Sequence, residues 1–298
     1  MVFCCRHAHD VFLCFWYWAG DRVVASLNQL LIVTCYRDQL QFKIQCQSIG
    51  RHLEPVALSI VINELDPYPW LTWYYQHCDG LLHKHQVQIL TYNDFVDIID
   101  FKNLFVHNKP ISGWIRQQIF KLAFAQRCSQ AYWIFDTKNW LIQSANLKDF
   151  NKRPRINIPV SQFMQSSSHD KFYFDLIDKL CPGQYHAFRP EITPYAIDPR
   201  IVNGMFEWFG GTDKFESWFV SHSSPSEFIA YDVFAQHLDL DHDQGQAMTN
   251  AIYYYGNSVN VDQIARNCLD PKLQMVSIHH SLLDPALLLQ LETLLNTE

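Results

Sequence analysis

Glycine is scarce in this chain, with 10 glycines among 298 residues, and no glycine-rich phosphate loop is present. Neither GxGxxG nor GxxxxGK follows the first strand-like segment, which argues against a dinucleotide-binding Rossmann protein and a P-loop enzyme. A GxSxG turn is missing as well, so a serine hydrolase of the nucleophile-elbow type is disfavoured.

Positive charge is also limited. The formal net charge is −7, and no run of Lys or Arg occurs. A nonspecific nucleic-acid binder needs many cations to displace counterions, so we expect no nucleic-acid partner. A narrow basic pocket for one phosphorylated small molecule remains compatible with this balance.

The nine cysteines are odd in number, irregular in spacing and without a CxxC pair. This pattern argues against a disulfide framework or a zinc cluster and favours free thiols in a reducing compartment. We therefore expect a cytoplasmic protein.

No stretch reaches 18 uninterrupted apolar residues, so no transmembrane segment is expected, although peripheral membrane contact stays open. The apolar segment 11–20, VFLCFWYWAG, is too short to span a bilayer and has no convincing cleavage site after it. We interpret residues 1–25 as an aromatic N-terminal extension that packs on the domain.

Short apolar runs alternate with a helical pattern in the first hundred residues. Segments 30–34 (LLIVT), 57–64 (ALSIVINE) and 85–94 (HQVQILTYND) are typical of buried strands. The segment between the first two has helical spacing, and Gly50 is expected to end that helix. This rhythm predicts an α/β fold, with a mixed, mostly parallel sheet flanked by helices.

The composition of the sequence changes after residue 150, where polar and proline-containing stretches alternate with short amphipathic segments. We expect residues 26–150, which contain the parallel strands, to form a first, ligand-binding half of the domain. Residues 151–298 are expected to form a less regular, acceptor-binding half of the same domain.

Ligands of parallel sheets bind beyond the carboxyl ends of the strands. Residues at those ends here are Thr34, Tyr36, Asn63, Glu64 and Asp94. We expect them to lie on the rim of a binding site.

The clearest helix covers 112–128, SGWIRQQIFKLAFAQRC, and a strand that ends at Asp136 follows it. An apolar run that stops at an acid is typical of a strand that delivers a polar group to a site. The alternative is that Asp136 and Asn139 only begin a turn, as these residue types often do.

The helix 113–122, GWIRQQIFKL, and the strand end 135–139, FDTKN, resemble a bacterial branch of the GT-A class of nucleotide-sugar glycosyltransferases. That branch has a G-W-x-x-Q-Q-x-x-K-L helix before a degenerate D-x-D strand. Further matches lie at 193–195 (TPY) and 226–234 (SEFIAYDVF). The resemblance implies a GT-A-like fold that transfers a sugar from a nucleotide-diphosphate donor to a hydroxyl acceptor. The acceptor would be a carbohydrate or a lipid-linked molecule in surface polysaccharide or glycolipid synthesis.

In that class, the second carboxylate of D-x-D holds a divalent metal against the diphosphate. Here Asp136 keeps the first position, and Lys138 occupies the second. A protonated lysine repels a cation but supplies positive charge itself. A metal-independent site is therefore favoured over a Mn²⁺ or Mg²⁺ site. If a metal binds, Asp136 and His280 are the expected ligands, although His280 can equally be a surface residue.

The resemblance gives Glu227 the role of binding or deprotonating the acceptor, beside Asp136 and Lys138 as catalytic residues. The alternative is that Glu227 only favours the start of a helix. The expected donor-binding residues are Thr34, Tyr36, Arg37, Asn63, Arg116, Gln117, Lys121 and Asn139. For Arg116, Gln117 and Lys121, a solvated helix face is the alternative.

Two other functions remain open at this stage. One is a non-catalytic nucleotide- or sugar-binding protein on the same fold. The other is a metal-dependent hydrolase that uses Asp136 and the pair His279 and His280, which predicts that metal is retained on purification.

Overall fold

The structure is a computed structural model that describes residues 28–100, 105–106, 109–150, 170–180, 193–238, 250–254, 261–279 and 282–296. The predicted N-terminal extension, residues 1–25, lies outside the described residues.

A five-stranded sheet forms the centre of the molecule, in the order β3-β2-β1-β6-β8. Its strands are β1 (Gln29–Thr34), β2 (Ala57–Ile62), β3 (Gln86–Leu90), β6 (Tyr132–Phe135) and β8 (Tyr195–Ile197). The first four pair in parallel, and β8 runs antiparallel to β6. The predicted mixed, mostly parallel sheet is confirmed, and a strand from the second half of the chain completes it.

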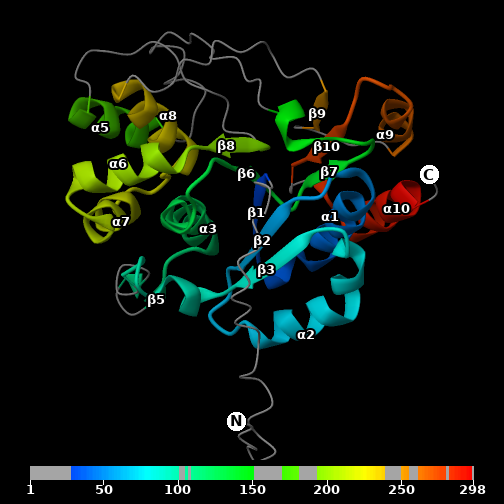
Figure 1. Ribbon diagram of the computed structural model, residues 1–298, viewed down its shortest axis with the longest axis horizontal. Coiled ribbons are helices and arrows are strands. Elements are labelled where there is room, and N and C mark those ends of the chain that lie inside the picture. Colours follow the sequence, from blue (N-terminus) through cyan, green and yellow to red (C-terminus); the bar gives the residue numbers. More distant parts are fainter. Residues whose placement is uncertain are drawn as a thin grey trace, which may run out of the picture.

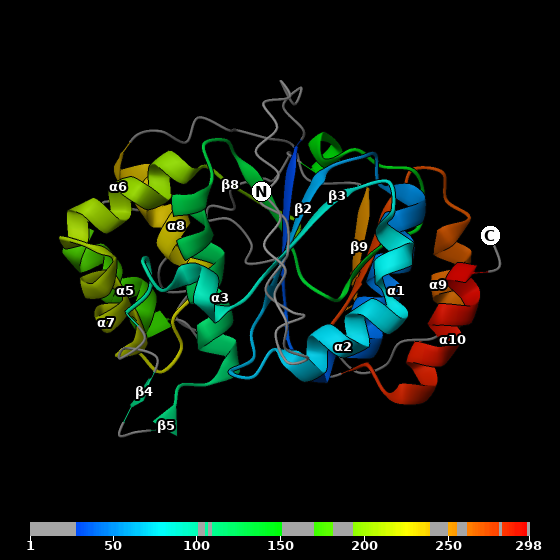
Figure 2. The same ribbon diagram turned by 60° about the horizontal axis from the view of Figure 1, so that its bottom comes forward.

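Helices cover both faces of this sheet (Figures 1 and 2). One face packs on α1 (Gln39–His52) and α2 (Tyr68–His77). The other packs on α3 (Gly113–Ala123), α5 (Asp170–Leu180), α6 (Pro199–Phe209), α7 (Thr212–Val220) and α8 (Glu227–His237). Short 3₁₀ turns connect these elements at η1 (Tyr36–Asp38), η2 (Asp79–Leu82), η3 (Tyr92–Phe95), η5 (Phe124–Arg127) and η6 (Leu147–Phe150).

A second sheet of three strands lies beyond α1, in the order β7-β10-β9. It contains β7 (Asn139–Leu141), β9 (Ala251–Tyr254) and β10 (Met275–Ile278), with α9 (Val261–Cys268) and α10 (Pro285–Asn296). A two-stranded ribbon, β4 (Phe105–Val106) and β5 (Lys109–Pro110), precedes α3. Because β7 follows β6 after three residues, the Asp136 turn joins the two sheets.

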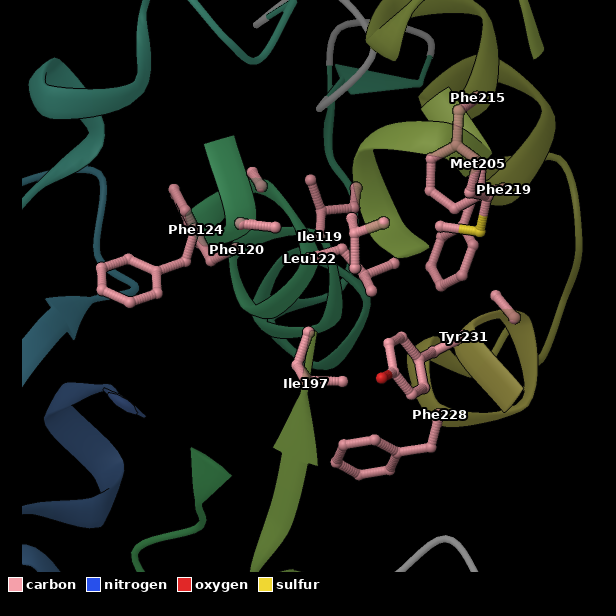
Figure 3. Close-up of a cluster of buried hydrophobic side chains, with 14 of the residues drawn as sticks. Ile119, Phe120, Leu122, Phe124, Ile197, Met205, Phe215, Phe219, Phe228 and Tyr231 are labelled. Carbon is pink, nitrogen blue, oxygen red and sulfur yellow. The ribbon is translucent and has the colours of Figure 1, made fainter. Parts of the chain in front are cut away.

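Successive side chains of β1 point to opposite faces of the sheet, and this explains why the protein has a hydrophobic core on each face. Leu31 and Val33 belong to the cluster under α3, whereas Leu30 and Ile32 belong to the cluster under α1. Such a strand is apolar throughout because both of its faces are buried. Figure 3 shows the α3 side, where Phe228 and Tyr231 of α8 lie beside Ile197 of β8.

Gly50 does not end the first helix, contrary to the prediction, because α1 continues to His52. A Cβ atom at Gly50 would lie 2.0 Å from the carbonyl oxygen of Leu81. Only a residue without a side chain permits this close approach of α1 to η2. This explains why a glycine occupies a position inside a helix, where it is otherwise unfavourable.

None of the helices in the described part of the chain is both long and apolar enough to cross a membrane.

Candidate active site

The chain changes direction across the sheet between β1 and β6. It passes outward from β1 to β2 and β3, and then returns to place β6 on the other side of β1. The crevice beyond the carboxyl ends at such a switch point is where ligands of open α/β sheets bind. Thr34 ends β1 and Asp136 follows β6, so both residues lie at this switch point.

Four side chains of alternating charge form a row at this position. Lys121 of α3 has its Nζ atom 2.8 Å from Oε1 of Glu227 and 2.9 Å from Oδ1 of Asp136. Lys138 lies on the far side of Asp136, with 3.4 Å between its Nζ atom and Oδ2. The order Glu227, Lys121, Asp136, Lys138 brings together all three predicted catalytic residues.

The ionised forms of the central pair stabilise each other. Burial raises the pKa of Asp136, but Lys121, Lys138 and a hydrogen bond from Thr193 outweigh it and hold that pKa well below its ordinary value. Burial lowers the pKa of Lys121, but Asp136 and Glu227 outweigh it and raise that pKa above its ordinary value. Asp136 is thus a carboxylate and Lys121 an ammonium at neutral pH.

The inner and outer ends of the row differ in exposure. The side chains of Lys121 and Glu227 are each 5% exposed, whereas those of Asp136 and Lys138 are 18% and 24% exposed. A ligand in the crevice therefore meets Asp136 and Lys138 first.

Glu227 occupies its position because it begins α8. The hydroxyl of Ser226 accepts a hydrogen bond from the backbone N–H of Ile229, and the amide oxygen of Gln118 accepts one from the backbone N–H of Glu227. Glu227 therefore starts a helix, and its carboxylate also lies in the row of charged side chains. Its Oε2 atom makes no hydrogen bond to any described residue.

The Asp136–Asn139 turn is anchored from inside the protein. The amide of buried Gln45 donates to the carbonyl oxygens of Asp136 and Asn139, at 2.6 and 3.2 Å. The Asn139 side chain accepts from the N–H of Asp136 and donates to the Thr193 carbonyl and the Ser277 hydroxyl. The Thr193 hydroxyl donates to Oδ2 of Asp136 at 3.0 Å.

Asn139 therefore fixes the turn, and the prediction that it contacts the donor is wrong for this geometry. Its side chain is completely buried, and its amide oxygen and nitrogen are both used within the protein. Gln45 is not among the predicted site residues, although it stands out in the sequence as a polar residue within the apolar stripe of a helix.

A second cation lies at the carboxyl end of β2. Arg116 donates through Nε to the side chain of Asn63 at 3.1 Å and through Nη1 to the carbonyl of Ile111 at 3.3 Å. The Tyr92 hydroxyl also donates to Asn63, and the amide of Asn63 donates to the carbonyl of Gly113. No carboxylate in the described part of the chain lies within ion-pair distance of the Arg116 guanidinium.

The alternative of a solvated helix face is wrong for two of the three residues on α3. Taken as whole residues, backbone included, Arg116 is 9% exposed and Lys121 is 4% exposed. Gln117 is half-buried, and its amide donates to the carbonyl of Val33 in β1 at 3.3 Å. The polar side of α3 therefore faces the strand ends.

The remaining predicted rim residues separate into exposed and buried groups. Tyr36 is 55% exposed, its backbone N–H donates to the Glu64 carboxylate at 2.6 Å, and Arg37 beside it is exposed. Thr34 is buried, with no hydrogen-bond partner for its hydroxyl among the described residues. Asp94 does not join the site, because it forms a capping box with Thr91.

The residues of this site do not fit a divalent metal. Both oxygens of Asp136 already contact ammonium groups, from Lys121 and Lys138. The described residues contain no group of three or more His, Cys, Asp or Glu side chains placed to hold a metal ion. The predicted ligand His280 lies outside the described residues.

No protein-family model matches the chain, and no curated protein matches it. Among solved structures, it is similar to the bifunctional glycosyltransferase WbbM, at 12% identity and a TM-score of 0.44, over 87% of this chain and 47% of that one. It is also similar to the galactosyltransferase LgtC in complex with donor and acceptor sugar analogues, at 10% identity and a TM-score of 0.42, over 90% of this chain and 95% of that one.

A third similar structure is mouse xyloside xylosyltransferase 1, at 8% identity and a TM-score of 0.44, over 86% of this chain and 99% of that one. This chain spans less than half the length of the WbbM chain.

Proposed function

We propose that this protein is a GT-A-like glycosyltransferase that moves a sugar from a nucleotide-diphosphate donor to a hydroxyl acceptor. The row Glu227, Lys121, Asp136 and Lys138 at the switch point of the sheet is the observation that carries the proposal. Sugar transfer from such a donor needs a carboxylate to orient hydroxyl groups and fixed positive charge near the leaving diphosphate. The row supplies both at one edge of the crevice.

Asp136 orients the donor in this proposal. It stays ionised at neutral pH and is partly exposed, so it accepts hydrogen bonds from hydroxyl groups of the ribose or the transferred sugar. Exposed Tyr36, across the switch point at the end of β1, is proposed to contact the nucleoside.

Two cations are proposed to compensate the diphosphate. Lys138 is the more exposed lysine of the row, and its only ion-pair partner among the described residues is Asp136. Arg116 is a buried guanidinium without a carboxylate partner in the described residues, and an anion at the strand ends would satisfy it. Lys121 was expected to contact the diphosphate, but its charge is already balanced by Asp136 and Glu227.

Glu227 is proposed to bind the acceptor through Oε2, the oxygen that Lys121 does not hold. There it would accept the hydrogen of the attacking hydroxyl and take its proton as the bond to the sugar forms. Lys121 holds the other oxygen, so it positions Glu227 relative to Asp136.

We further propose that transfer proceeds without a divalent metal, with Lys138 in place of the second motif carboxylate. The contact of Lys138 with Asp136 supports this, because an ammonium group at that distance repels a cation from the same carboxylate. The proposed acceptor is a carbohydrate or lipid-linked molecule of surface polysaccharide or glycolipid synthesis. The cytoplasm is the proposed location, supported by the free thiols of Cys35, Cys46, Cys78, Cys128 and Cys268.

Calorimetric titration with UDP and GDP, with and without Mn²⁺, tests the donor site, and a donor-hydrolysis assay tests turnover. We expect one nucleotide to bind without metal and its sugar conjugate to be hydrolysed slowly. Binding without turnover for every donor would instead support a non-catalytic binding protein. If neither nucleotide binds, the proposal is overturned.

A further inference from the structure

Three polar side chains interrupt the apolar face of the main sheet under α3. They are Gln29 in β1, Ser59 in β2 and Gln88 in β3. Ser59 and Gln88 are register partners on adjacent strands. Gln29 lies diagonally, two residues before Leu31, which is the partner of Ser59 in β1.

Apart from Gln86 at the start of β3, the rest of this face is apolar. Toward the carboxyl ends of the strands it is formed by Leu31, Val33, Val61 and Leu90. Strands of a parallel sheet that is covered on both faces normally carry continuous apolar sequence. β3 is an edge strand with Gln88 exposed, whereas Ser59 of β2 is buried, so the polar stripe runs from the exposed edge of the sheet into its interior.

A hollow of about 460 Å³ opens at this stripe. Its floor includes Gln29, Ser59 and Gln88, and its wall includes Asp97, Phe124 and Arg127. Asp136 follows the carboxyl end of β6, so the hollow lies at the opposite end of the sheet from the candidate active site.

The wall is braced by contacts between separate segments. Arg127 donates to the carbonyl of Asp94, and its guanidinium lies 5.5 Å from the ring centre of Phe95. The side chain of Gln126 donates to the hydroxyl of Thr212 in α7 at 2.7 Å. The hollow is thus preformed, as small-molecule sites usually are.

Polar groups in the hollow lack protein partners among the described residues. The Oε1 atom of Gln29 is sealed from solvent and accepts no hydrogen bond. The side chains of Ser59, Gln88 and Asp97 make no hydrogen bond or ion pair with any described residue. The oxygen and nitrogen atoms of Ser59, Gln88 and Asp97 are therefore available for hydrogen bonds to a bound molecule.

We propose that this hollow binds a neutral, hydroxyl-rich small molecule of mono- to disaccharide size. Hydroxyl groups both donate and accept hydrogen bonds, as the amides of Gln29 and Gln88 and the hydroxyl of Ser59 do. Asp97 and Arg127 contribute opposite charges at the wall, which disfavours an anion or a cation as the ligand. The volume falls in the range of about 300–1,000 Å³ that is typical of small-molecule sites. This site is separate from the proposed transferase site and does not depend on it.

Saturation-transfer NMR on the full chain tests the site, with methyl α-D-glucopyranoside, methyl β-D-galactopyranoside and lactose as probes. We expect at least one sugar to bind. The variants Gln88→Leu and Ser59→Val each remove hydrogen-bonding groups from the floor and are expected to weaken that binding about ten-fold. Gln86→Leu is the matched control, because Gln86 lies in the same strand but outside the lining.

The Asp136→Asn variant separates this site from the transferase site, and it is expected to leave sugar binding to the hollow unchanged. Thermal melting checks that the Gln88→Leu and Ser59→Val variants are folded, which is expected because each change replaces a polar group by an apolar one of similar size. The proposal is overturned if no probe binds the wild-type chain, since the hollow then holds only water. It is also overturned if both floor variants bind the sugar as the wild type does.

Discussion

Lys121 and Glu227 are 106 residues apart in the chain, and their charged groups lie 2.8 Å apart in the fold. The pair joins α3 of the first half to α8 of the second. Because Lys121 also contacts Asp136, one buried ammonium group holds together the two carboxylates that the proposed reaction uses.

Replacing Lys121 with Met is therefore expected to lower the free energy of unfolding by about 3–5 kcal/mol, since Asp136 and Glu227 would lose their buried partner. Urea denaturation measures this change. Lys43→Met is the control, because Lys43 pairs with Glu292 in a more exposed position and should lose less than about 1 kcal/mol. Equal losses in the two variants would show that the central pair is no stronger than a surface pair.

Lys138→Asp restores the second carboxylate of a D-x-D motif and removes the ammonium group beside Asp136. Donor hydrolysis without metal is expected to fall roughly 10²-fold, as when a charge-stabilising group is lost, and to recover with Mn²⁺. The exposed Lys148→Asp change is the control and should alter neither rate nor metal response. If Lys138→Asp behaves like Lys148→Asp, the DTKN segment is a turn without a role in the donor site.

Arg116→Met removes the buried guanidinium that lacks a carboxylate partner in the described residues. Affinity for UDP or GDP is expected to fall roughly 10- to 100-fold, which corresponds to the loss of a hydrogen bond to a charged group. Affinity for the matching nucleoside, uridine or guanosine, should change little, because it carries no diphosphate. Calorimetry on both ligands distinguishes the two cases, and the exposed Arg51→Met variant is the control. Equal weakening of nucleotide and nucleoside would place Arg116 away from the diphosphate.

Because of Asp136, the free energy of unfolding is expected to fall as the pH is lowered into the acid range. Its pKa in the folded protein lies below that of an unfolded chain, so the unfolded state binds more protons as the pH falls. Its contribution is fully present above about pH 4 and is lost as the pH falls further toward the folded pKa. Denaturation at several pH values should therefore show a shallower loss below about pH 4 for Asp136→Asn than for the wild type. Between pH 5 and 8 their difference in stability should stay constant. Parallel curves down to low pH would mean that Asp136 is not held ionised by its lysines.

Gly50→Ala should destabilise the fold by about 1–3 kcal/mol, as over-packing typically does, because the new Cβ atom meets the backbone of Leu81. Gly80→Ala is the matched control, since nothing lies within 4 Å of a Cβ atom there. Thermal melting of both variants measures the difference. Similar melting temperatures would show that α1 and η2 separate easily.

Local sequence pattern predicts the sheet well. Each of the buried runs at β1, β2 and β6 is almost purely apolar and ends in a polar residue, so its type and its carboxyl end can be read directly. The pattern also places Asp136 at the carboxyl end of a strand, where ligands of parallel sheets bind.

Contacts across long separations were less predictable. Gln45 anchors a turn 91 residues away, and Thr193 reaches Asp136 from 57 residues away. Neither residue has a neighbour in sequence that reveals its partner. A solvated helix face stayed open as the alternative for Lys121 and Arg116 for the same reason, since only the folded chain brings carboxylates and strand ends to that side of α3.

The antiparallel strand β8 closes the outer edge of β6. A growing chain that has reached only residue 150 therefore exposes β6 as an open edge, which invites pairing with other chains. It also lacks Glu227, so only three of the four side chains of the row are present, and it lacks Thr193, which donates to Asp136. Protection of the sheet edge thus waits for the synthesis of β8 (Tyr195–Ile197), and completion of the row waits for Glu227, which is made later.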